Sequence, residues 1–310
     1  MLVEEELAAL SPKKDTLLTI GVFDGVHLGH KYLISQLIEH AKKQDLLSGG
    51  VTFRQHPQEI LLPQTKLPFL TDLTERINLL KKEGVEVIIA LSFTSELAQL
   101  SACQFVSLLK KYLRMRGLLI GPDFALGRDR EGNTNTLRTL GQDMDFTVTV
   151  VPPVIINGEM VSSTAIRNAL ADGDMKRVSN LIGRPFSLHG HVITGSGRGV
   201  ELGFPTANLD MDSEQALPVE GVYATWAYID DKAYQSMTNI GKRPTFGGSQ
   251  PTVEVHVPDY LGDLYGRELK IDIIERLRSE KKFDTVEELK KQIAEDVKQG
   301  RAILDFRGGD

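Results

Sequence analysis

Short apolar runs separated by helical patterns make up the first half of the chain. β-prone runs lie at 17–23, 50–53, 85–91, 118–121 and 147–151. The run at 85–91 is almost continuously apolar, as expected of a strand that is covered on both faces. Because strands alternate with helices, the pattern predicts an α/β domain with a doubly wound parallel sheet and right-handed crossovers.

Helix signals fall between these runs. Asp72 and Ser101 are suited to cap helices, and a side chain that completes a capping box stands at the third position after each. A further helical pattern, which begins after His27, has apolar residues at Leu33, Ile34, Leu37 and Ile38. The residues up to about Asp15 are expected to form a lead-in segment.

The pattern changes between Asn180 and Pro185. Short β-type runs with frequent glycines follow, at 191–194, 222–229, 236–240, 252–257 and 269–277. Strands at regular spacing without helices between them predict an antiparallel β-barrel. A helix from Asp284, with one apolar face, is expected to plug or flank this barrel. The sequence therefore predicts two domains, at 1–182 and 183–310.

Composition agrees with two globular domains and narrows the partners. The 310 residues are 41% hydrophobic and 25% charged, and the net charge of −6 provides no broad basic field for nucleic acid. Cys103 is the only cysteine, which excludes an intrachain disulfide and a cysteine-ligated zinc site. The acidic start of the chain and the lack of a membrane-length apolar run predict a cytoplasmic protein without a membrane segment. The oligomeric state stays open.

The segment from Gly21 to His30 is the main candidate for chemistry. A strand that ends in a glycine turn and restarts as a helix presents free backbone N–H groups, which suit a phosphate. His27 and His30 are three residues apart and share one face of the first helical turn. The simpler alternative is a tight turn with two surface histidines. The segment fits neither the Rossmann fingerprint nor a P-loop.

Other polar residues follow strands of the same predicted sheet. Ligands of such sheets bind beyond the carboxyl ends of the strands, which is where His56 and Asp123 are expected. Ser163, Thr164 and Arg167 open a helix, where hydroxyl groups, amides and a cation suit a polyphosphate. Helix capping alone, a loop histidine and a solvated loop are the structural alternatives.

The predicted barrel has a second set of polar residues. Gly197, Arg198 and Gly199 belong to a glycine-rich loop that could wrap phosphates, with a hairpin and a proline turn as the alternative. Thr206 and Asn208 follow Pro205, and their oxygens could reach Mg²⁺. Glu254 shares a strand face with Thr252 and His256, and faces either solvent or the barrel mouth, where it would act as a base.

These motifs resemble those of known enzymes. The segment HLGH, with SSTAIR farther along, resembles the signatures of the nucleotidylyltransferase superfamily. Nearly the whole chain, from about Thr16, resembles the prokaryotic bifunctional riboflavin kinase/FMN adenylyltransferase family. Further motifs that carry the resemblance are TFRQHP, GPDFALG, GRGVELGFPTAN, NIGKRPTF, VEVH, DLYG and LRSEKKFD.

The resemblance implies a role for each half. The barrel would phosphorylate riboflavin with ATP and Mg²⁺, and the α/β domain would join FMN to AMP from a second ATP, forming FAD and pyrophosphate. In the barrel, Thr206 and Asn208 would hold the metal, Glu254 would be the base, and Arg278 and Phe283 would lie near the flavin. The ATP contacts there would come from Gly197, Arg198 and Gly199.

The resemblance likewise assigns the α/β domain. His27 and His30 would stabilise adenylyl transfer, and His56 would be a flavin contact. The expected ATP contacts are Gly21, Phe23, Asp24, Gly25, Asp123, Ser163, Thr164 and Arg167.

Two departures from the family pattern affect the expected contacts. Val200 and Glu201 stand where many relatives have a basic residue, and Ala125 and Leu126 replace a common basic or aromatic pair. Two other readings remain. One is a flavin- or nucleotide-binding regulator without catalysis, and the other is a nucleotidylyltransferase for a different substrate.

Overall fold

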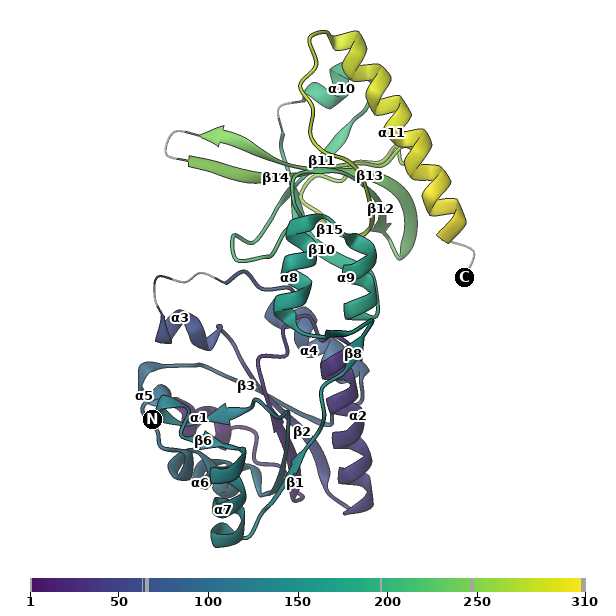
Figure 1. Cartoon of the computed structure of the whole chain (residues 1–310). Coiled ribbons are helices and arrows are strands. Elements are labelled where there is room, and N and C mark those ends of the chain that lie inside the picture. Colours follow the sequence, from purple (N-terminus) through teal and green to yellow (C-terminus); the bar gives the residue numbers. More distant parts are fainter. Residues whose placement is uncertain (1, 63, 65–66, 196, 246–247, 308–310) are drawn as a thin grey trace. The chain divides into compact units, whose positions relative to one another are not determined.

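The chain folds into two compact units in the computed structural model (Figure 1). The structure describes residues 2–62, 64, 67–195, 197–245 and 248–307. Contacts between residues divide the chain after Ser163, so the helix that begins there carries the chain into the second unit. Within the described residues, every helix falls short of the length or the apolarity that crossing a membrane requires.

The first unit consists of alternating helices and strands. Its elements are α1 (Leu2–Ala8), β1 (Thr16–Ile20), α2 (Leu28–Lys43), β2 (Leu47–Phe53), α3 (Pro57–Leu61), α4 (Leu73–Lys82), β3 (Val87–Leu91), α5 (Ser95–Ala98), α6 (Ala102–Leu113), β4 (Met115–Ile120), β5 (Ala125–Leu126), η1 (Arg128–Arg130), β6 (Gly132–Asn133), α7 (Thr134–Met144), β7 (Thr147–Val150), β8 (Ile155–Ile156) and β9 (Glu159–Met160).

A parallel sheet with the order β3-β2-β1-β4-β7 forms the centre of this unit. Alternate residues of β1 and β4 enter different cores. Leu18 and Leu118 pack with α6 and α7, whereas Leu17 and Leu119 pack with α2. Both faces are therefore covered by helices, which confirms the predicted doubly wound sheet.

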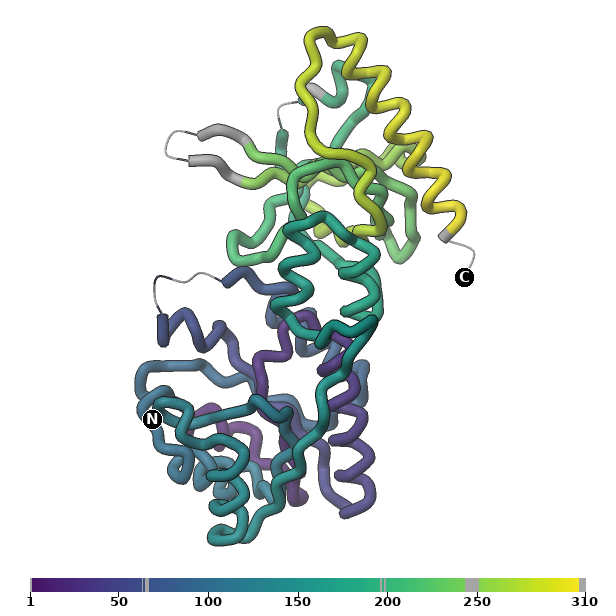
Figure 2. Tube along the Cα trace, in the orientation of Figure 1, coloured from purple at the N-terminus to yellow at the C-terminus, as the bar shows by residue number. Residues whose placement is uncertain are grey.

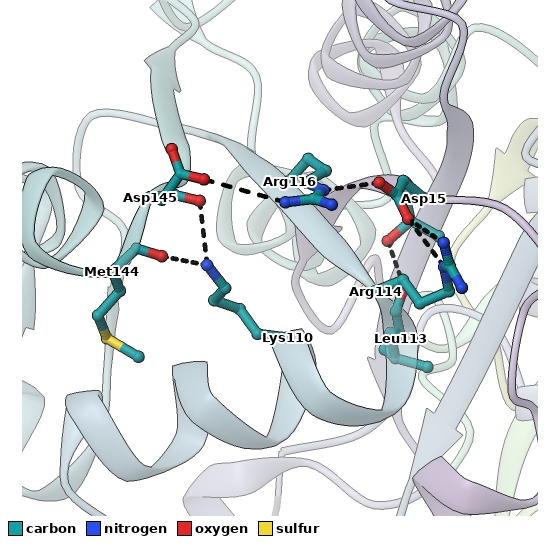
Figure 3. Close-up of polar contacts among 8 residues, drawn as sticks. Asp15, Lys110, Leu113, Arg114, Arg116, Met144 and Asp145 are labelled. Carbon is teal, nitrogen blue, oxygen red and sulfur yellow. Dashed lines mark hydrogen bonds and ion pairs between the residues drawn. The ribbon is translucent and has the colours of Figure 1, made fainter.

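A network of charged groups ties together the amino ends of neighbouring strands (Figure 3). Asp15, just before β1, accepts hydrogen bonds from Arg114 at 2.8 Å and from Arg116 at 2.6 Å. Arg116 also lies 3.9 Å from the carboxylate of Asp145, and Lys110 donates to the Asp145 carbonyl at 3.0 Å. Hydrogen bonds from the two arginines lower the pKa of Asp15. The candidate site lies at the opposite edge of the sheet, at the carboxyl ends of the strands.

The second unit is a β-barrel with helices at both ends of its sequence. Its elements are α8 (Ser163–Asp172), α9 (Met175–Ile182), β10 (Phe186–Ile193), α10 (Arg198–Leu202), β11 (Thr206–Asp210), β12 (Gly221–Ile229), β13 (Lys232–Thr245), β14 (Gly248–His256), β15 (Glu268–Arg278) and α11 (Val286–Arg307).

The barrel closes in the order β10-β11-β14-β13-β12-β15, and its pairings are antiparallel. The predicted antiparallel barrel is thus confirmed. The terminal helix α11, at the yellow end of the trace in Figure 2, packs against β12, β13 and β15. Leu304 of this helix is fully buried and belongs to one cluster with Ala224, Met237 and Ile274. The helix therefore flanks the barrel, as one of the two predicted positions.

Several elements differ from the sequence prediction. The lead-in segment contains α1, whose Leu7 is fully buried. The residues from Thr206, for which a proline turn is the alternative interpretation, form the strand β11, and part of the glycine-rich loop forms the short helix α10. Short segments give little sequence signal for such elements, because the partner strands and helices that stabilise them are distant in sequence.

Candidate active sites

The turn after β1 is held in an unusual backbone conformation. Phe23 and Val26 have φ values of 53° and 38°, and Gly25 has a φ of 81°. The Phe23 ring folds back over Gly21, where a Cβ atom would lie 3.2 Å from the ring. Residues other than glycine rarely adopt a positive φ unless the surrounding structure enforces it. Such backbone strain often marks functional sites.

His27 and His30 form a stacked pair at the start of α2. Their ring centroids are 3.6 Å apart, and the planes differ by 18°. His27 is the N-cap residue, and its Nδ1 accepts a hydrogen bond from the His30 backbone N–H at 3.3 Å. The Nδ1 atom of His30 is buried and has no hydrogen-bond partner among the described residues. The pair thus presents a polar atom that a ligand could satisfy.

Burial lowers the pKa of His30 well below 6.5, and the nearby His27 and Arg76 lower it further. His30 is therefore neutral at physiological pH. A neutral imidazole can donate one hydrogen bond and accept another. It can also stack on His27 without the repulsion that two imidazolium cations would exert.

The segment from Gly21 to His30 and the SSTAIR segment contact each other through Asp24 and Ser163. The Ser163 hydroxyl donates a hydrogen bond to the Asp24 carbonyl at 2.9 Å, across 139 residues of sequence. Asp24 turns its carboxylate to the backbone N–H groups of Leu70 and Thr71, at 2.9 to 3.1 Å. Asp24 thus has a structural role in the turn, and its contact with a nucleotide stays a prediction.

The remaining candidate residues for adenylyl transfer are not all in the first unit. His56 caps α3, where its Nδ1 accepts from the Gln58 N–H at 3.2 Å. Asp123 is exposed, and its carbonyl accepts from Arg130 at 3.0 Å. Thr164 and Arg167 continue α8 into the second unit. The ligand contacts expected of these four residues stay predictions.

A pocket of about 500 Å³ opens in the second unit. It is lined by every barrel residue that the sequence singled out and whose side chain is described: Gly197, Gly199, Thr206, Asn208, Glu254, Arg278 and Phe283. For Arg198 the structure describes the backbone, as the first residue of α10, and not the side chain.

Strand register brings the polar residues of this pocket together. Glu254 of β14 is directly opposite Asn208 of β11 on one side and Asn239 of β13 on the other. Thr206 is opposite His256 in the same ladder. Residues that alternate along a strand share one face, so these side chains line one wall. The face of β14 that carries Glu254 is therefore the pocket face, not a solvent face.

Close backbone contacts hold the threonine and the asparagine in place. His256 Nδ1 is 2.8 Å from the Pro205 carbonyl, and burial lowers the pKa of this histidine, so the ring is neutral and donates this bond. A Cβ on Gly195 would lie 2.1 Å from the Asn208 amide nitrogen. Only glycine lets the backbone approach Asn208 so closely.

Arg278 and Phe283 form the wall of the pocket that adjoins α11. The Arg278 guanidinium donates to both oxygens of Asp296 at 2.8 to 3.0 Å, and Asp296 is only 3% exposed. The guanidinium also lies 5.8 Å from the Phe283 ring centroid. A bidentate ion pair of this kind fixes the arginine firmly, so this wall of the pocket is preorganised by the terminal helix.

Comparisons with known proteins cover both units. A family model described as FAD synthetase matches residues 10–165, and one described as riboflavin kinase matches residues 182–304. The bifunctional riboflavin kinase/FMN adenylyltransferase of Escherichia coli (strain K12) is 38% identical over 296 residues, which span 95% of this chain and 94% of that protein. The chain belongs to the bifunctional riboflavin kinase/FMN adenylyltransferase family.

Other members of the family show the same extent of similarity. The Bacillus subtilis (strain 168) protein is 34% identical over 305 residues, covering 96% of this chain and 93% of its own. Among solved structures, that of a macrolide-efflux protein from Streptococcus pneumoniae has a TM-score of 0.88 at 32% identity, over 95% of this chain and 96% of that one. The likeness extends across both units.

The sequence analysis missed several residues that support the sites. Arg76 donates to the Val22 carbonyl within the candidate turn, Asn239 is paired in register with Glu254, and Asp296 accepts from Arg278. For Arg76 a signal exists, because it stands three and four residues before Leu79 and Leu80, which are buried on α4. A charged residue on an apolar helix face points to a specific partner. Asp296 gives the same kind of signal, because it stands three residues after Ile293 and seven after Leu289 on one face of α11. Its partner Arg278, 18 residues away on another element, is not evident from the sequence.

Proposed function

We propose that the chain makes FAD in two steps, each with its own ATP. The barrel phosphorylates riboflavin to FMN, and the α/β unit transfers AMP to the FMN phosphate and releases pyrophosphate. The observation that supports the pair of activities is the presence of two separate polar sites, one in each unit, each built from residues of a different family motif.

In the barrel, Glu254 accepts the proton of the riboflavin 5′-hydroxyl as the oxygen attacks the γ-phosphate of ATP. The neighbouring Asn208 and Asn239 hold the base in line, and Gly197, Arg198 and Gly199 contact the ATP phosphates. Positioning and charge stabilisation dominate phosphoryl transfer, so this small set of groups is sufficient. Arg278 and Phe283 contact the flavin from the α11 side of the pocket.

Mg²⁺ fits the residues at this site. Thr206 and Asn208 supply oxygen donors on the same wall as the Glu254 carboxylate. Mg²⁺ commonly takes one or two protein oxygens and completes its shell with water and substrate phosphates. The described residues contain no cluster of three or more histidine, cysteine or acidic side chains, so a closed protein cage is not what these groups form. When bound, the ion would neutralise charge on the ATP phosphates.

In the α/β unit, the backbone N–H groups of Val22 and Phe23 and the histidine pair face the α-phosphate of a second ATP. The N–H groups of Gly21 and Gly25 donate instead to the Val51 carbonyl and the Thr71 hydroxyl. The FMN phosphate oxygen attacks this phosphorus, the bond to the bridging oxygen breaks, and pyrophosphate leaves. His27 and His30 donate hydrogen bonds to the oxygens that gain charge in the transition state. Ser163, Thr164 and Arg167 hold the departing phosphates, and Phe23, Asp24, His56 and Asp123 border the substrates.

The partners of the protein are small molecules, namely ATP, riboflavin and FMN, rather than nucleic acid. The net charge of −6 supports this, because nucleic-acid binding generally needs a basic surface. We place the protein in the cytoplasm, where the ATP that both steps need is made, and assign adenylyl transfer to residues 1–182 and the kinase to residues 183–310.

Incubation with ATP and Mg²⁺, once with riboflavin and once with FMN, tests the proposal. Chromatography of the flavins should show FMN and FAD in the first case and FAD in the second. A regulator without catalysis would bind flavin or nucleotide and form neither product. An adenylyltransferase for another substrate would leave riboflavin unphosphorylated.

A further inference from the structure

Arg76 is a fully buried cation next to the candidate adenylyl-transfer turn. It lies on α4 and is 0% exposed, the largest fully buried side chain of the described residues. Its Nη1 donates to the Val22 carbonyl at 2.8 Å, and its guanidinium lies 5.0 Å from the Phe69 ring centroid. Its Nε is buried without a hydrogen-bond partner among the described residues. Burying an arginine is costly, so a specific use is expected.

The Val22 carbonyl, which accepts the hydrogen bond from Arg76, lies next to the strained part of the turn. Val22 immediately precedes Phe23, the first of the residues with positive φ in the turn. The Val22 carbonyl also accepts from the Thr52 hydroxyl at 2.9 Å. On the other side of the turn, the Gly25 N–H donates to the Thr71 hydroxyl at 3.1 Å. Groups from β2 and from the segment that leads into α4 thus hold the turn from both ends, and Arg76 is the charged one among them.

Arg76 also influences the histidine pair. The Phe23 ring, held by this turn, packs edge-on against His30 with centroids 5.3 Å apart. The charged or titratable groups that act on His30 are His27 on its own helix and Arg76 from α4. Burial lowers the pKa of Arg76, whereas Asp24 in the turn and Asp72 at the start of α4 favour its charged form. Arg76 therefore places a permanent positive charge near an imidazole that is buried and unpartnered.

We propose that Arg76 is a positioning residue for adenylyl transfer, which fixes the strained turn through the Val22 carbonyl and thereby holds the Phe23 ring against His30. The inference rests on the proposed function of this turn. Arg76 touches no reacting atom. Its guanidinium supports the backbone N–H groups that face the phosphate, and its charge opposes a proton on His30.

Two variants separate the geometric from the electrostatic part. Arg76→Met removes the hydrogen bond and the charge, whereas Arg76→Lys keeps a charge that cannot reproduce the planar fork. Arg138→Met, at an exposed position on α7, is the matched control. The readouts are the pH dependence of FAD formation from FMN and the titration of the His30 ring by NMR. FMN formation from riboflavin and the circular dichroism of each preparation report on folding.

The proposal expects the following results. In Arg76→Met the pKa of His30 rises, and the acid limb of FAD formation moves to higher pH, with a loss of roughly tenfold or more in kcat. In Arg76→Lys the acid limb stays in place while kcat falls about tenfold, because the turn loses its fork. Arg138→Met behaves like the unaltered chain in every readout.

Unchanged His30 titration and an unchanged acid limb in folded Arg76→Met would overturn the electrostatic part. Full activity in Arg76→Lys would overturn the geometric part. If Arg76→Met does not fold, Arg76→Lys still decides, because a raised His30 pKa in that variant contradicts the proposal. The unaltered chain tests the proposed function itself: if it forms no FAD from FMN, the assignment of the turn fails whatever the variants do.

Discussion

Strand register determines the neighbours of Glu254, the base of the proposed kinase reaction. Asn208 and Asn239 lie directly opposite it on the two neighbouring strands, at the short lateral spacing of a sheet. The Asn239 amide donates to Glu280 at 3.3 Å, and an amide beside the proposed base does not compete for the proton that the base would accept. A base held in this way keeps its direction toward a hydroxyl group while the substrate moves in.

Glu254→Gln should therefore remove FMN formation. The amide cannot accept the hydroxyl proton as a base, and we expect kcat for riboflavin phosphorylation to fall about 10²- to 10⁴-fold. FAD formation from supplied FMN should persist, because that step uses the other unit. Glu268→Gln, at an exposed position on β15, is the control and should match the unaltered chain in assays of both steps.

His30 should make folding sensitive to acid. Because its pKa in the folded protein lies well below 6.5, the unfolded chain binds more protons between that lowered pKa and 6.5. The contribution of the neutral ring is fully present above pH 6.5 and decreases as the pH falls through this window. Denaturant unfolding is monitored by hydrogen exchange of the β1 amides. It should show that His30→Gln loses less stability than the unaltered chain between pH 7 and pH 5. An equal loss in both would contradict the assigned environment of His30.

For single residues, the sequence indicates which residue types belong to a site better than it indicates what surrounds them. The spacing of His27 and His30 predicts a shared face, and the structure shows them stacked. The spacing cannot reveal that Asp24 binds the backbone of Leu70 and Thr71, since those residues are 46 and 47 positions away. Burial and partners come from tertiary contacts, which a local pattern does not encode.

Among the elements, α11 connects the stability of the barrel with its pocket. Its inner residues Leu289, Ile293 and Asp296 line the pocket, and Leu304 near its end is fully buried against the barrel. Asp296 carries the ion pair that holds Arg278. Loosening this helix should therefore affect flavin binding as well as folding.

Leu304→Ala should destabilise the barrel unit by about 2–5 kcal/mol, because it leaves a cavity among well-packed side chains. Phe306→Ala, two residues along the same helix, removes a larger side chain that is 88% exposed and should cost less than about 0.5 kcal/mol. Thermal unfolding of the two variants checks this. Equal effects would show that α11 does not pack on the barrel as described.

Element prediction succeeds where an apolar run is bounded by clear turn or capping signals. The strands near 50–53, 118–121 and 222–229 and the capped helix after Ser101 are all present. β11 escapes prediction because its five residues, TANLD, have little β-propensity and follow a proline. Pairing with β10 and β14 makes it a strand, and this pairing depends on barrel closure.

For the whole molecule, the central claim is that the two chemistries occupy different units. The charged network in Figure 3 and the histidine turn belong to the α/β unit, and the pocket around Glu254 belongs to the barrel. The order of the two predicted domains, and their fold classes, follow from the change of periodicity near residue 180. Contacts place the division after Ser163, because α8 and α9 pack with barrel residues that no local pattern connects to them.

His30→Ala should stop the second step and leave FMN to accumulate from riboflavin. Loss of one donor to the transferring phosphoryl group is expected to cost FAD formation about 10²- to 10³-fold. His40→Ala, near the end of the same helix, is the control and should keep FAD formation. Unchanged FAD output in His30→Ala would remove this histidine from the mechanism.

The most direct measurement tests each of the two site variants with each of the two flavins. Each of Glu254→Gln, His30→Ala and the unaltered chain is incubated with ATP and Mg²⁺, starting from riboflavin or from FMN, and the flavins are separated by chromatography. The account predicts that Glu254→Gln makes FAD from FMN but nothing from riboflavin, and that His30→Ala makes FMN from riboflavin but no FAD. Loss of both activities in either folded variant would contradict it, as would an unaltered chain that converts neither flavin.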